Sequence, residues 1–128
     1  MSREYQFIQV LMPEEKLQGG LMLLTENEAP AWWPIMLVAQ EPEDFSREWG
    51  IEFQESFDDL DRLKIAVLDL VSGTMVVLRR YRGAPLGGTD VCVAFDAMTR
   101  SQEINKEVMD TFGLCDADIL WSQFADNK

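Results

Sequence analysis

Two β-rich runs, residues 63–70 and 74–81, constrain the fold of this chain more than any other feature of its sequence. They are separated by Val71-Ser72-Gly73, a short segment ending in glycine that is typical of a hairpin turn. In each run, apolar residues occur at odd-numbered and at even-numbered positions, so both faces of each strand carry apolar side chains. Strands of this kind lie in the middle of a sheet. The sequence therefore predicts a β-hairpin at the centre of a sheet.

Several shorter segments are predicted to add strands to this hairpin, because they are apolar or alternate between apolar and polar residues. These predicted strands are residues 5–12, 21–25, 35–39, 51–57 and 90–95, while residues 119–124 form either a short strand or a helix. Residues 26–34 are expected to form a loop that contains the paired tryptophans Trp32 and Trp33.

Helix signals mark two further segments. Residues 42–49 begin with Pro42, which suits the first position of a helix, and two acids follow it at the positive end of the helix dipole. Gly50 is a natural end for this helix. Residues 99–112 carry an apolar stripe at helical spacing and are followed by Gly113.

These elements predict a single α+β domain over residues 1–128. A chain of 128 residues is long enough to bury one hydrophobic core. We expect an antiparallel or mixed sheet of about five to six strands with the C-terminal helix packed on one face.

The composition excludes several kinds of chemistry. The chain contains no histidine, which removes Ser-His-Asp and Cys-His catalytic arrangements and imidazole metal ligands. Cys92 lies in an apolar run, and Cys115 follows a predicted helix, where the dipole disfavours a thiolate. We therefore expect no enzyme activity, no cofactor and no metal site. With neither a signal peptide nor an apolar segment of membrane-spanning length, the expected location is the cytoplasm.

The charge balance indicates what kind of partner the protein could bind. Eleven Lys and Arg residues face 23 Asp and Glu residues, so the formal net charge is −12. Such a chain repels nucleic acid and anionic lipid, and its favoured macromolecular partners are basic. The alternative is that the acids serve solubility alone.

The negative charge is concentrated between residues 41 and 61, where nine acids occur with one base, Arg47. This segment could steer a basic partner towards the protein by electrostatic attraction, or it could be a solvated face. Tryptophans are enriched at interface hot spots, so a tryptophan beside these acids could act as an anchor. The candidate partner-binding residues are Trp32, Trp33, Glu41, Glu43, Asp44, Glu48, Glu52, Glu55, Asp58 and Asp59.

A smaller group of basic residues occurs in the second run of the hairpin. The run ends in Arg79-Arg80-Tyr81-Arg82, and Arg62 and Lys64 belong to the neighbouring strand. These residues could bind an acidic ligand or single-stranded nucleic acid, or they could form ion pairs within the protein.

In its size, its acidity and its clustered carboxylates, the chain resembles the immunity proteins of bacterial toxin systems, notably those of contact-dependent growth inhibition. The resemblance covers the character of the whole chain and involves no sequence motif. It implies tight binding to one cognate toxin domain, often a basic nuclease, whose substrate cleft the acidic surface would occupy. Three other interpretations fit the sequence, of which the plainest is a structural or adaptor domain. Another is an acidic nucleic-acid mimic that inhibits a DNA-binding protein, and the third is a small ligand-binding or enzyme domain with an anion site at the arginine hairpin.

Overall fold

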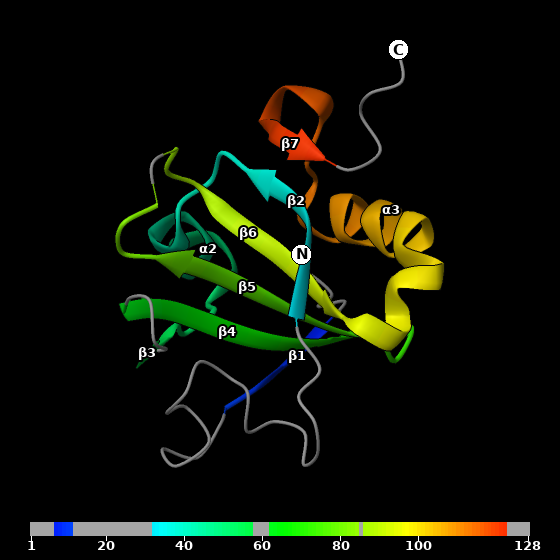
Figure 1. Ribbon diagram of the computed structural model, residues 1–128, viewed down its shortest axis with the longest axis horizontal. Helices are drawn as coiled ribbons and strands as arrows, with labels where there is room; N and C mark the ends of the chain where they lie inside the picture. The colour runs from blue at the N-terminus through cyan, green and yellow to red at the C-terminus, as the bar shows by residue number, and fades with distance from the viewer. Residues whose placement is uncertain (1–6, 12–31, 58–61, 85, 123–128) are drawn as a thin grey trace, which may run out of the picture.

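The computed structural model describes residues 7–11, 32–57, 62–84 and 86–122 of the chain, and the structural statements that follow concern these residues. Seven antiparallel strands form one sheet, and Figure 1 shows its central strands side by side. The strands are β1 (Phe7–Val10), β2 (Trp32–Val38), β3 (Gln54–Phe57), β4 (Arg62–Leu70), β5 (Met75–Tyr81), β6 (Thr89–Ala94) and β7 (Ile119–Ser122). The helices are α2 (Pro42–Trp49) and α3 (Ser101–Phe112), with 3₁₀ turns η2 (Phe95–Arg100) and η3 (Asp116–Asp118).

The predicted hairpin is the centre of the sheet. The strand order is β1-β4-β5-β6-β2-β7, so β4 and β5 both have neighbours on each side. The hairpin turn is closed by the backbone N–H of Gly73, which donates to the carbonyl of Leu70 at 2.7 Å. Gly73 adopts a φ of 91°, which glycine tolerates far better than other residues.

Two short strands share the outer edge of β4. β1 pairs with residues 67–70 of β4, and β3 pairs with residues 62–65. The Gln9 side chain joins β1 to the segment before β3, because it accepts from the backbone N–H of Glu52 at 2.8 Å and donates to the Glu52 carbonyl at 2.5 Å. The segment between α2 and β3 is thereby fixed to the sheet.

Both helices contribute to one core on the same face of the sheet. Phe45 of α2 and Phe112 of α3 lie in this core with ring centroids 5.3 Å apart, and Trp49 packs against Phe112 at 5.2 Å. The opposite face carries a second buried cluster, against which Trp32 and Tyr81 pack. This cluster contains Leu63, Ile65, Val67, Val77 and Cys92. Apolar residues on both faces of β4 and β5 are therefore buried, as central strands require.

The predicted fold class is confirmed: the structure is α+β, with an antiparallel sheet and a C-terminal helix packed on one face. The sheet has seven strands rather than five to six, partly because the segment at residues 119–122 forms a strand, β7. The predicted strand at residues 21–25 lies outside the described residues.

The prediction of a loop over residues 26–34 is wrong for residues 32–34. Trp32, Trp33 and Pro34 belong to β2, where they pair with residues 92–94 of β6. This pairing joins segments about 60 residues apart, and its register shifts between Pro34 and Met36. The two prolines that flank the tryptophans predict a loop locally, but long-range pairing decides the structure of this segment.

Candidate functional site

Glu41, at the start of α2, is used to hold the protein together. Its carboxylate contacts the Arg80 guanidinium of β5 and accepts a hydrogen bond from the backbone N–H of Gly88 at 3.1 Å. The same Arg80 Nη1 donates to the Gly88 carbonyl at 3.1 Å. Glu41 therefore connects α2, β5 and the segment before β6, and this role competes with partner binding.

Asp44 has a similar internal role within the helix. Its Oδ2 accepts from the backbone N–H of Glu41 at 2.9 Å, and its Oδ1 pairs with Arg47 at 2.5 Å. The hydrogen bond from Glu41, and then the contact with Arg47, lower the pKa of Asp44 below its usual value. The ionised carboxylate therefore caps the first turn of α2.

Four of the predicted carboxylates are exposed at the surface of α2, β3 and the segment between them. We call these residues the acidic strip: Glu43, Glu48, Glu52 and Glu55. Glu43 lies 3.6 Å from the Lys64 ammonium, a pair in which both side chains are largely exposed. Exposed pairs of this kind contribute little to stability.

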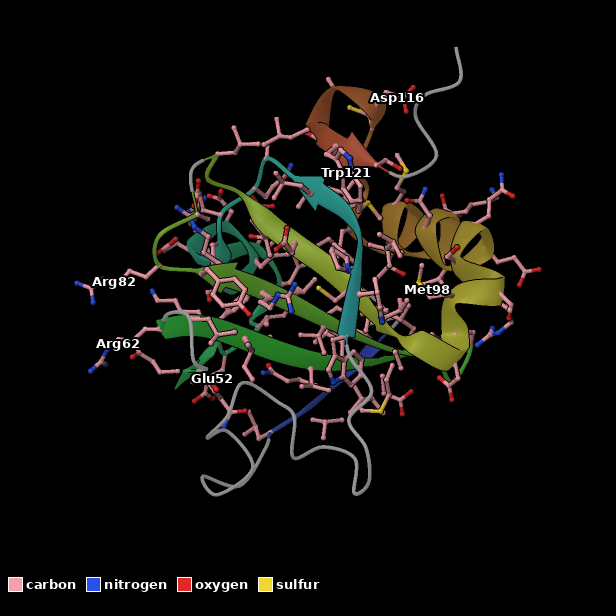
Figure 2. All side chains as sticks on the ribbon, in the orientation of Figure 1. Glu52, Arg62, Arg82, Met98, Asp116 and Trp121 are labelled. Carbon is pink, nitrogen blue, oxygen red and sulfur yellow. The ribbon has the colours of Figure 1, made fainter. Side chains whose placement is uncertain are left out.

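An open hollow of about 650 Å³ lies between α2 and β3. Three members of the acidic strip line it, Glu43, Glu52 and Glu55, together with the cations Arg47 and Lys64. Its apolar lining includes Phe53, which packs against the main core. Glu52, labelled in Figure 2, marks this end of the molecule. The hollow thus combines exposed carboxylates with a fixed apolar wall.

The two tryptophans do not lie beside the acidic strip. Trp32 packs against the second cluster, on the face opposite the helices, while Trp33 is 45% exposed. Both occupy the start of β2, whereas α2 follows its end at Val38. At the rise of an extended strand, about 17 Å separates Trp33 from Val38. Asp58 and Asp59, the last two predicted contacts, lie outside the described residues.

The basic residues of the hairpin separate into two groups. Arg79 lies on the face opposite the helices, 3.9 Å from Asp90 and 5.1 Å from the centre of the Tyr81 ring. Desolvation raises the pKa of Asp90, while Arg79 and Arg80 oppose that effect. Arg80 points to the other face, so the sequence interpretation of residues 79–82 as one basic group is corrected.

The second basic group surrounds a hollow of about 350 Å³ at the open end of the hairpin. We call this feature the basic hollow. It is lined by Arg62, Lys64, Arg80 and Arg82, with Leu63 and Glu55. Sequence reasoning named these cations but not their arrangement. The sequence does contain a signal for this arrangement. The cations occur at every second position near the outer ends of two strands, and these strands pair antiparallel, so the cations lie on one face.

Sequence reasoning also missed two exposed apolar residues in the edge strand β7. Leu120 is 49% exposed and Trp121 is 46% exposed. In Figure 2, Trp121 lies near the top of the molecule, away from Arg62 and Arg82 at its left edge. The pairing of Trp121 with Leu37 of β2 is a tertiary contact, which the four-residue strand does not reveal by itself.

The described residues contain no group of three or more acids and cysteines placed to hold a metal ion. Burial raises the pKa of the Cys92 thiol to about 12. Cys115 is exposed, with its sulfur 3.4 Å from the Asp118 carboxylate. Among the residues that the structure describes, no helix is long and apolar enough to cross a membrane.

Comparison with known proteins gives no match: no family model, curated protein or solved structure is significantly similar to this chain. The candidate site is therefore defined by its own geometry.

Proposed function

We propose that this protein binds a basic partner protein through the acidic strip and acts as an immunity protein that neutralises a cognate toxin domain. The observation that carries the proposal is the gathering of Glu43, Glu52 and Glu55 around one open hollow with an apolar wall. Carboxylates that served solubility alone would not need to surround a hollow. The resemblance in size and charge to immunity proteins supplies the biological role.

A basic nuclease is the partner that suits this surface best. Its cleft is positive because its substrate is a polyanion, so exposed carboxylates can take the place of phosphates. Carboxylates at the rim of the interface raise the association rate, and the apolar wall at Phe53 lowers the rate of dissociation when it is desolvated. Binding then excludes nucleic acid from the cleft without any chemical step by this protein.

In this role, one molecule of the protein binds one molecule of toxin. Such an inhibitor needs no cofactor and no catalytic residue. It acts in the cytoplasm, where the toxin would reach nucleic acid and where the free thiols of Cys92 and Cys115 stay reduced.

The test is capture of partners by the tagged protein from its native cytosol, with bound proteins identified by mass spectrometry. We expect one basic toxin domain in stoichiometric amount at low salt, and less of it at high salt. The triple variant Glu43→Lys, Glu52→Lys, Glu55→Lys should lose this partner, because it reverses the charge around the hollow.

A matched variant distinguishes the effect of the acidic strip on partner binding from the effect of net charge. Glu103, Asp110 and Asp116 are exposed on and after α3, and their reversal to lysine changes the net charge equally. We expect this control to retain the partner with reduced salt dependence. Equal loss of binding in both triple variants, or capture of a host DNA-binding protein instead of a toxin, would contradict the proposal.

A further inference from the structure

The pairing of β4 with β5 places four cations on one face at one end of the sheet. Lys64 lies directly opposite Arg80 in the register of the two strands. One step further out, the backbone N–H of Arg82 donates to the carbonyl of Arg62 at 2.9 Å, so these two residues also face each other. Because side chains alternate along a strand, both pairs point to the same face.

Like charges directly opposite each other across two strands are destabilising. In the inner pair, this repulsion is offset by contacts from the start of α2. Arg80 contacts the Glu41 carboxylate, and Lys64 lies 3.6 Å from Glu43. The inner pair is therefore neutralised by the protein itself.

The outer pair lies nearer the open end of the hairpin than the inner pair. The side chains of Arg62 and Arg82 are exposed, and Figure 2 shows both projecting from the same end of the hairpin. Within the described residues, the Arg82 guanidinium makes no ion pair or side-chain hydrogen bond. A protein with a net charge of −12 thus keeps an available arginine beside three other cations.

These cations do not lie on a flat surface but line the basic hollow. Four cationic side chains and one carboxylate, Glu55, surround its volume of about 350 Å³. That volume falls at the lower end of the range for small-molecule sites. Arginine guanidinium groups present paired N–H donors that match the oxygens of a phosphate group.

We propose that the basic hollow binds a small, multiply charged oxyanion of the phosphate class, held between Arg62 and Arg82 with Lys64 behind it. This inference does not depend on the proposed function, although Glu55 and Lys64 line both the basic hollow and the hollow beside the acidic strip. A long polyanion such as nucleic acid is disfavoured, because it would extend from the hollow towards the surrounding carboxylates.

The proposal can be tested with inorganic phosphate and pyrophosphate as probes. Backbone amide signals of the folded protein would be followed by NMR at low ionic strength, against sodium chloride of equal ionic strength. We expect saturable shifts at residues 62–64 and 80–82, with pyrophosphate bound more tightly than phosphate. Arg82→Gln and Arg62→Gln should each weaken pyrophosphate binding by about tenfold, the loss expected for one charge-assisted contact.

Two further variants control the experiment. Arg47→Gln removes an exposed arginine that lines the other hollow, and it should leave pyrophosphate affinity unchanged within about twofold. Glu55→Gln removes the carboxylate from the basic hollow and should tighten binding. The affinity of the basic hollow for pyrophosphate should therefore rise in Glu55→Gln, whereas the affinity of the acidic strip for its protein partner should fall.

Three results would overturn the assignment. The first is the absence of saturable shifts at phosphate concentrations on the order of 10 mM, since weaker binding is not specific. The second is an equal loss of affinity in the Arg82→Gln and Arg47→Gln variants. The third is tighter binding of a short single-stranded oligonucleotide than of pyrophosphate, which would identify a nucleic-acid site instead.

Discussion

At the scale of single residues, Gly88 fixes how closely the segment before β6 approaches β2. It has a φ of 82°, and a Cβ atom added to it would lie 2.2 Å from the Val38 carbonyl oxygen. The neighbouring backbone cannot move easily, since Thr89 pairs with Val38 and the Gly88 N–H is bonded to Glu41. We predict that Gly88→Ala lowers the free energy of unfolding by about 3 kcal/mol, the sum of left-handed strain and a backbone clash.

The matched control for this prediction is Gly73→Ala. Gly73 also has a positive φ, 91°, but an added Cβ would meet nothing within 4 Å. It should cost about 1 kcal/mol, from backbone strain alone. Urea denaturation of the two variants measures the difference, and equal losses would show that the contact with Val38 is not restrictive.

Individual residues also show which parts of the candidate site the sequence can predict. The exposure of Glu43, Glu52 and Glu55 follows from their type and spacing, since carboxylates stay in water unless they find a partner. The internal roles of Glu41 and Asp44 do not follow as easily. Glu41 contacts Arg80 and Gly88, which are 39 and 47 residues away, and only the folded arrangement reveals such pairs.

At the scale of elements, the helix α2 depends on its capping carboxylate. The pKa of Asp44 is lowered in the folded protein, so the ionised form stabilises the fold. This contribution is fully present above the unfolded pKa, near 3.8, and is lost as the pH falls through the lower folded value. We predict that the stability difference between the wild type and Asp44→Asn shrinks as the pH is lowered below 3.8.

An NMR titration of the Asp44 carboxyl carbon measures this directly. The backbone hydrogen bond from Glu41 is the larger cause of the lowered pKa, and Arg47 is the smaller one. In Arg47→Gln, the Asp44 pKa should therefore rise partway but remain below 3.8. A return to the ordinary value in this variant would assign the effect to the ion pair instead.

Elements also differ in how well the sequence predicts them. The bounds of α2 agree with the prediction because its signals are local: Pro42 at the first position, acids in the first turn, and Gly50 with a φ of 71° at the end. The start of β2 is set by pairing with β6, which lies on the other side of the β4–β5 hairpin in the sequence. Local signals at Trp32 and Trp33 therefore predict a loop where a strand forms.

At the scale of the whole molecule, the net charge of −12 favours binding of a basic partner but lowers the stability of the fold through repulsion between carboxylates. Carboxylates held close together repel one another, and folding brings those of the acidic strip into one region. A surface selected for stability alone would carry fewer of them. We therefore expect the acidic strip to be retained at a cost to the fold.

The variant Glu52→Gln tests this expectation, because the change removes charge with little change in side-chain size, and Glu52 does not line the basic hollow as Glu55 does. At low ionic strength, its melting temperature should exceed that of the wild type by about 1 °C, since the relieved repulsion is worth a few tenths of a kcal/mol. In 0.5 M sodium chloride the gain should vanish, because a Debye length of about 4 Å screens exposed charges. Thermal denaturation followed by circular dichroism at both salt concentrations measures the two values. A lower melting temperature at low salt would mean that the Glu52 carboxylate stabilises the fold, and the acidic strip would then need no partner to explain it.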